Sequence, residues 1–154
     1  MVLLKSEVVL KKGDKAPDFT LLGIDDKKHT LSEFKNETVM IGINSNDPTN
    51  YPDDSFENMK KFAKEKGIQF TYLVDETQEI AKKYGAVCTP DPFLFDQERK
   101  LAFHGRIDNA ISSEDVATEK TMINNIEKLL SGKKIEKDFD PSLGCSIKWK
   151  SQQT

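Results

Sequence analysis

Sulfur and imidazole are scarce in this sequence of 154 residues, which contains two cysteines and two histidines. The cysteines, Cys88 and Cys145, lie far apart in the chain, so the sequence contains no Cys-x-x-C dithiol. None of the cysteines and histidines stands at the spacing that structural zinc sites use. We therefore expect neither a metal site nor a cofactor.

Long apolar runs and an excess of one charge are also missing. No stretch approaches the roughly 20 apolar residues that cross a bilayer, and Lys5 and Glu7 break the amino-terminal apolar residues that a signal peptide would need. The net charge is only -3, which gives no electrostatic reason to bind nucleic acid. We expect a cytoplasmic protein whose cysteines are thiols at rest, and which binds neither nucleic acid nor membrane.

The hydrophobic pattern predicts strands and helices in alternation. Strands are expected at residues 18–22, 27–31, 38–44, 68–74, 92–96 and 100–105, the first two as a hairpin and 38–44 buried on both faces. Helices are expected from Ser55 to Gly67, between Asp75 and Gly85, and from Ser112 or Ser113 to Gly132. Asp54 with Glu57, and Asp75 with Gln78, have the spacing of capping boxes.

This order reads βαβαββα from residue 38 onward, which predicts an α/β fold of three layers with a mixed sheet. We expect a single domain over residues 1–154. Its parts are an N-terminal hairpin extension at 13–37, a core at 38–132 and an irregular tail at 133–154.

Six segments carry a family pattern in a fixed order: GDKAPDFTLLGIDDKKHTLSEFK, GINSNDP, YPDDSFENMKKFAKEKG, YLVDETQEIAKKYGAVCTPDPFLFD, HGRID and GCSIKWK. Together they cover most of the chain. The sequence thereby resembles the alkyl hydroperoxide reductase/thiol-specific antioxidant (AhpC/TSA; redoxin, peroxiredoxin-like) branch of the thioredoxin-like superfamily. The resemblance implies a thioredoxin-like fold with a cis proline at Pro90, and oxidoreductase activity as a thiol-disulfide exchanger or antioxidant.

The chain departs from this family at the catalytic dithiol. Family members of this kind place a Cys-x-x-C at the start of a helix after an LSEFK-like segment, whereas here LSEFKNETVM runs straight into IGINSND. The comparison implies that a strand-helix segment has been lost and that residues 38–44 are one fused strand. We therefore expect redox activity to be absent or weak, and the residues leave open whether the chain is an enzyme.

Cys88 is the candidate catalytic residue, and Cys145 is a second candidate thiol that could pair with it on oxidation. In the functional interpretation, Cys88 faces a cleft and transfers thiols by forming a mixed disulfide with a partner protein. In the structural interpretation, it is a small buried residue at the start of a strand. An unperturbed thiol is mostly protonated at neutral pH, which favours the structural interpretation.

The loop at Thr89 and Pro90 supports a different function. Backbone N–H and C=O groups beside a cis proline can pair with an extended peptide as an added strand, which would make the chain a redox-silent binding module. An enzyme needs an acidic and accessible thiol, whereas a module needs only an exposed backbone edge. The fused strand would also leave a sheet edge exposed, and a homodimer that covers it is a further hypothesis.

The remaining polar and aromatic residues receive structural interpretations. We expect His104 to lie on the surface or half-buried on its strand, and the Ser45 hydroxyl to bond to backbone in a loop. The larger aromatic residues are expected to pack in the core or the tail: Phe93, Phe95, Phe103 and Trp149.

Overall fold

The computed structural model describes residues 3–151, which divide into two compact units. The first, which we call the cysteine unit, comprises the described residues up to Ala16 together with Tyr84–Ser146. The second, the hairpin unit, comprises Pro17–Lys83 and the described residues from Ile147. The single domain expected from the sequence stays a prediction.

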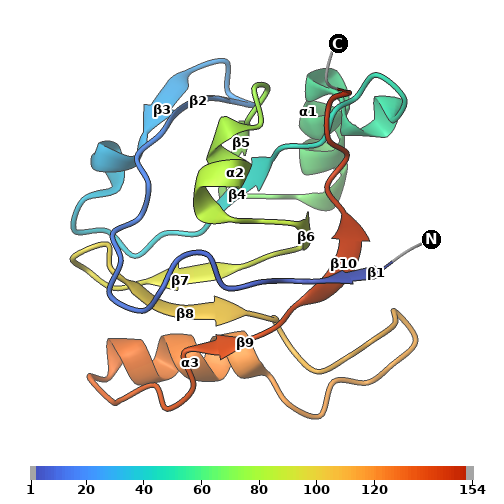
Figure 1. The fold of residues 1–154 in the computed structure, drawn as a ribbon. Coiled ribbons are helices and arrows are strands. Elements are labelled where there is room, and N and C mark those ends of the chain that lie inside the picture. The colour runs from blue at the N-terminus through green and yellow to red at the C-terminus, as the bar shows by residue number, and fades with distance from the viewer. Residues whose placement is uncertain (1–2, 152–154) are drawn as a thin grey trace. The chain divides into compact units, whose positions relative to one another are not determined.

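The hairpin unit contains a four-stranded sheet in the order β3-β2-β5-β4 (Figure 1). Its strands are β2 (Thr20–Gly23), β3 (Lys28–Thr30), β4 (Ile41–Asn44) and β5 (Thr71–Val74). Strand β2 pairs antiparallel with β3, as the predicted hairpin requires, while β4 and β5 are parallel. Helix α1 (Phe56–Lys66) connects β4 to β5 and completes the first βαβ unit. Two short 3-10 helices, η1 (Leu31–Phe34) and η2 (Pro52–Asp54), precede β4 and α1 respectively.

The cysteine unit contains two three-stranded sheets. In one sheet, β10 (Leu143–Ser146) lies between β1 (Leu3–Lys5) and β6 (Cys88–Thr89), and both pairings are antiparallel (Figure 1). The other sheet has the order β7-β8-β9 and consists of β7 (Phe93–Phe95), β8 (Leu101–Gly105) and β9 (Phe139–Asp140). Helix α3 (Thr121–Leu130) packs its Met122 against Phe103 of β8 and Ile135 in the apolar core of this unit.

The mixed α/β class and the order of elements predicted from the sequence are confirmed, with β6 as an extra short strand before β7. Two of the three sheets contain both parallel and antiparallel neighbours. The second helix, α2 (Glu79–Tyr84), is shorter than expected. None of the helices within residues 3–151 is long and apolar enough to cross a membrane.

The strand expected at residues 38–44 differs from its prediction. Only Ile41–Asn44 form β4, and all four residues are half-buried, whereas burial on both faces was expected for residues 38–44. The physical reason is that β4 is an edge strand of its sheet, with β5 as its one hydrogen-bonded neighbour within the described residues. Met40, just before the strand, is 67% exposed.

The helix caps also differ from their predictions. Ser55, one residue beyond Asp54, is the N-cap of α1, because its side chain accepts a hydrogen bond from the amide of Asn58. Asp75, which precedes α2, accepts a hydrogen bond from the amide of Ala81 within the helix. The side chain of Gln78 donates to the carbonyl oxygen of Ser45 instead of capping α2, so these two residues do not form the predicted capping box. Gly67 and Gly85, which were expected to end these helices, follow them with positive φ angles.

Two segments were assigned to the wrong class. Helix α3 begins at Thr121 rather than Ser112 or Ser113, because the side chain of Asn109 accepts from the amides of Thr118 and Glu119 and holds the preceding residues as a loop. Val116, expected on the apolar face of this helix, is 88% exposed. The tail expected to be irregular contributes β9 and β10, so residues 139–146 belong to the sheets.

Gly105 at the end of β8 provides a test of the close approach between β8 and β9. Its φ is +149°, and a Cβ atom there would overlap the backbone carbonyl of Asp140. We expect Gly105→Ala to lower the free energy of unfolding by at least about 2 kcal/mol more than Gly132→Ala. Gly132 also has a positive φ, but nothing lies within 4 Å of its added Cβ. Equal losses in chemical denaturation would contradict the β8–β9 register.

Candidate functional site

Cys88 lies in β6 and is 1% exposed. Its Sγ atom is 3.8 Å from the hydroxyl of Ser142 and 3.9 Å from the carbonyl oxygen of Pro90. Burial, and then the negative charge of Asp91, raise the pKa of the Cys88 thiol above its ordinary value. A raised pKa and a buried sulfur both reduce the fraction of reactive thiolate at neutral pH.

A buried carboxylate lies at the centre of this site. Asp91 Oδ1 accepts hydrogen bonds from His104 Nε2 at 2.7 Å and from Ser142 Oγ at 2.9 Å, and Asp91 Oδ2 accepts from the amide of Val87 at 3.3 Å. The side chains of Asp91 and His104 are each 2% exposed. Because a buried carboxylate is costly without partners, these donors are what makes the position of Asp91 tolerable.

His104 was expected on the surface or half-buried, and this expectation is wrong. Its ring stacks on Phe93 with centroids 4.0 Å apart and an interplanar angle of 12°, and it also contacts the ring of Phe139. Since a carboxylate can only accept, the Nε2 atom that faces Asp91 carries a proton. The strand pattern placed His104 correctly in β8, but nothing local in the sequence identified its partner.

Ser142 connects the carboxylate to the thiol. Its hydroxyl has one hydrogen, which it donates to Asp91 at 2.9 Å. The sulfur of Cys88 lies 3.8 Å from the same hydroxyl oxygen. Burial and the charge of Asp91 outweigh the effect of this contact on the thiol pKa, so the protonated thiol is favoured. In a Ser-His-Asp triad the serine hydroxyl bonds to the histidine, and the histidine bonds to the aspartate. Among the described contacts Ser142 bonds to Asp91 and not to His104, so these residues do not form such a triad.

Cys145 does not face Cys88. In the pairing of β6 with β10, Cys145 is opposite Thr89, and Cys88 is opposite Ser146. Successive residues of a strand point to opposite faces of the sheet, so the two sulfur atoms lie on different faces. Both cysteines are thiols, and a disulfide between them would require β6 and β10 to change register.

Thr89 and Pro90 lie at the surface. Both residues are exposed, and the peptide bond between them is cis, as the resemblance implied. Strand β6 is at the edge of its sheet, with β10 on one side. Within that sheet, the other side of β6 carries no strand among the described residues. The Thr89–Pro90 loop therefore adjoins the outer strand of this sheet, in which Cys88 is buried and Thr89 is exposed.

Ser45 belongs to a second buried network, in the hairpin unit. Its hydroxyl donates to Asp75 Oδ2 at 2.9 Å, so the expected bond to backbone is replaced by a bond to a carboxylate. Gln78 donates to the carbonyl oxygens of Ser45 at 2.6 Å and Lys148 at 2.8 Å, and accepts from the amide of Lys150. These bonds fasten the C-terminal segment and explain why Gln78 does not cap α2.

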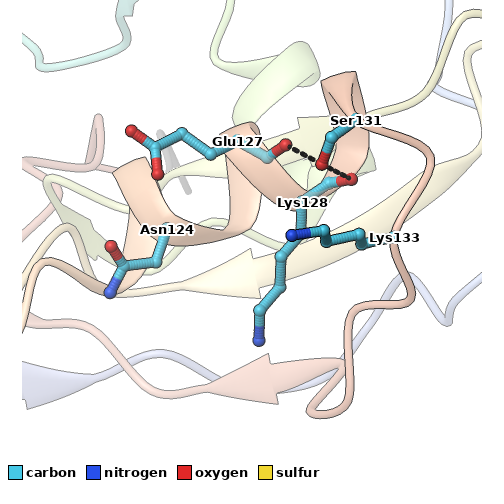
Figure 2. Close-up of a pocket in the computed structure, with 5 residues that line it drawn as sticks. All are labelled: Asn124, Glu127, Lys128, Ser131 and Lys133. Carbon is cyan, nitrogen blue, oxygen red and sulfur yellow. Dashed lines mark hydrogen bonds between the residues drawn. The ribbon is translucent and has the colours of Figure 1, made fainter.

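The surface pocket beside α3 does not have the side chains of a catalytic or metal site. A hollow of about 330 Å³ lies beside the C-terminal half of α3, where Ser131 Oγ donates to the backbone carbonyls of Glu127 and Lys128 (Figure 2). Its side chains are those of a solvated helix surface. Within residues 3–151, no three metal-binding side chains come together.

The comparisons with known proteins agree with the fold. The AhpC/TSA family model matches residues 40–104. An uncharacterized conserved protein from Geobacillus kaustophilus is 32% identical, with 99% of each chain covered and a TM-score of 0.91. Hypothetical protein SMc02350 from Sinorhizobium meliloti 1021 is 30% identical, with 96% of this chain and 98% of that one covered and a TM-score of 0.89.

More distant structures share the fold alone. A thiol peroxidase from Chromobacterium violaceum is 19% identical, with 84% of this chain and 91% of that one covered and a TM-score of 0.56. No protein of curated function matches the chain. The likeness to these structures defines a thioredoxin-like fold. Residues 40–104, which the AhpC/TSA family model matches, carry the sequence likeness to that family.

The Asp91–His104 pair provides a test of the buried network. In Asp91→Asn, one of the two carboxylate oxygens becomes an NH2 group. This group would face either the N–H of Val87 or the donors of His104 and Ser142, and in both cases acceptors are lost. We expect a loss of about 3–5 kcal/mol in the free energy of unfolding. The matched control is Asp25→Asn, which breaks the pair of Asp25 with His29 at the surface and should cost under about 1 kcal/mol. Denaturant titrations of both variants would measure the difference, and similar losses would contradict the role assigned to Asp91.

Proposed function

We propose that this thioredoxin-like chain is a redoxin-family protein that acts as a redox-silent protein-binding module, and that it binds an extended peptide at the Thr89–Pro90 loop. The observation that carries the first half of this proposal is the state of Cys88. Its sulfur is buried and its pKa is raised, whereas a redox-active cysteine needs an exposed sulfur and a lowered pKa. The sequence supplies no second sulfur next to it.

The second half of the proposal is supported by the backbone around β6. An extended peptide gains affinity by adding a strand to an open sheet edge, and gains specificity from the side chains beside that edge. The side of β6 away from β10 has no further strand of its sheet among the described residues. The exposed Thr89 and Pro90 would lie next to the added strand and contact its side chains.

Transfer of thiols through Cys88 alone is the alternative function. It would require the segment at Ser142 to move away, because the Ser142 hydroxyl lies 3.8 Å from the buried sulfur. It would also require the thiol to lose its proton beside the Asp91 carboxylate, which the negative charge opposes.

We expect Cys88 to be unreactive in the folded protein. In Cys145→Ser, alkylation of Cys88 by iodoacetamide should be at least about tenfold slower in the folded protein than in denaturant. Its rate should rise with pH, with no midpoint below the ordinary value of 9.0, because burial and Asp91 both disfavour the thiolate. Consumption of peroxide with dithiothreitol should be equal for the natural chain and for Cys88→Ser. Fast alkylation near pH 7, together with turnover lost in Cys88→Ser, would support thiol transfer instead.

We expect binding of extended peptides to be sensitive to Thr89. A fluorescent library of peptides rich in β-branched residues provides the probe, and amide shift mapping should place the bound peptides at Cys88 and Thr89. Thr89→Arg should weaken this binding by about tenfold, because the longer charged side chain would compete with the added strand. Thr20→Arg is the control, since Thr20 is an exposed strand residue of the hairpin unit. Binding that is absent, or equally weakened by both substitutions, would refute the binding site.

A further inference from the structure

We propose that this chain forms a homodimer in which the N-terminal strand pairs, antiparallel and edge to edge, with the same strand of a second copy. The proposal stands apart from the proposed peptide site, which uses the opposite edge of the same sheet. Strand β1 is the outer strand of the order β1-β10-β6. All three of its residues are exposed, whereas the four residues of the other candidate edge, β4, are half-buried.

The hydrogen bonds to β10 determine which backbone groups of this strand point outward. The amide of Ser6 donates to the carbonyl oxygen of Ser142 at 3.0 Å, so Ser6 faces β10. In an antiparallel pair, residues alternate between facing the neighbouring strand and facing away from it. Leu4, which is paired with Gly144, therefore also faces β10. The N–H and C=O groups of Leu3 and Lys5 are then directed away from β10. Strand β1 ends at Lys5, and in the proposed dimer the strand continues through Glu7, whose backbone groups follow the same alternation.

The charges along this edge select one register. A two-fold axis at Ser6 places Lys5 opposite Glu7 of the partner subunit, and the symmetry gives this ion pair twice. In the extended strand of the dimer, both residues direct their backbone groups toward the partner subunit, so they form a hydrogen-bonded pair as well as an ion pair. An axis at Lys5 would instead place two lysines opposite each other, which is unfavourable.

The same register also pairs apolar side chains. It places Leu3 opposite Val9 of the partner subunit, and Leu4 opposite Val8 of the partner subunit. These apolar side chains are exposed to solvent: Leu3 is 45% exposed, Leu4 37%, and Val8 and Val9 53% each. Pairing would remove apolar surface from water on both faces of the extended sheet.

The contact is short, so the dimer should be weak. Standard interfaces between proteins bury about 1,200–2,000 Å², and one pair of edge strands covers only part of such an area. The dimer should therefore form and dissociate with protein concentration. Strand edges with a charge at their centre commonly resist pairing. Here the lysine is matched by a glutamate two residues later, which permits pairing in one register.

Substitutions that exchange the charges of Lys5 and Glu7 test the proposed dimer and its register. Sedimentation velocity of the full chain, without an N-terminal tag, would measure the dissociation constant for the natural sequence, Lys5→Glu, Glu7→Lys and the double variant. Each single variant should weaken the dimer by roughly tenfold, because two attractions become two repulsions. The double variant restores both ion pairs and should return to within about threefold of the natural value. Lys61→Glu, an exposed position in the hairpin unit, controls for net charge.

A mixture of the two single variants gives the sharpest result. Lys5→Glu presents two glutamates and Glu7→Lys presents two lysines, so the mixed dimer should be tighter than either homodimer. Circular dichroism of each variant would confirm that the fold is intact. The proposal is overturned if the natural chain stays monomeric up to millimolar concentration, if Lys61→Glu weakens the dimer as much as Lys5→Glu, or if the mixture shows no preference.

Discussion

The cysteine unit depends on the burial of one carboxylate. Asp91 takes its hydrogen bonds from three separate places: the amide of Val87 before β6, His104 in β8, and Ser142 in the turn between β9 and β10. A carboxylate without such donors would not remain charged in an apolar interior. The need to satisfy this one charge therefore fixes the Thr89–Pro90 loop, the hairpin β7-β8 and the C-terminal strands with respect to one another within the unit.

The same charge also determines the chemistry of the neighbouring thiol. A reactive cysteine requires positive potential or hydrogen-bond donors that stabilise the thiolate. Cys88 has a buried environment and a carboxylate nearby, and Ser142 uses its only hydrogen on that carboxylate. The interaction that holds the unit together is therefore unfavourable for thiolate formation.

The sequence predicted the parts of the fold that are determined locally. The hairpin of β2 and β3, helix α1 and the pair β7-β8 follow from turns, caps and apolar spacing within short windows. The network at Asp91 could not be predicted in this way, because Ser142 is 51 positions away in the chain. Two-residue strands such as β9 give no periodic signal either. The start of α3 was misplaced because apolar residues of an ordered loop continued the helical pattern.

The C-terminal segment contributes to the fold of each unit through contacts of its backbone. Strand β10 occupies the space between β1 and β6, and Gly144 is required there because a Cβ atom would overlap the carbonyl of Thr89. Beyond β10, Gln78 binds the backbone of Lys148 and Lys150 in the hairpin unit. The position of the C-terminal segment is therefore determined largely by hydrogen bonds to its backbone. Its position between β1 and β6 makes these two strands the edges of their sheet.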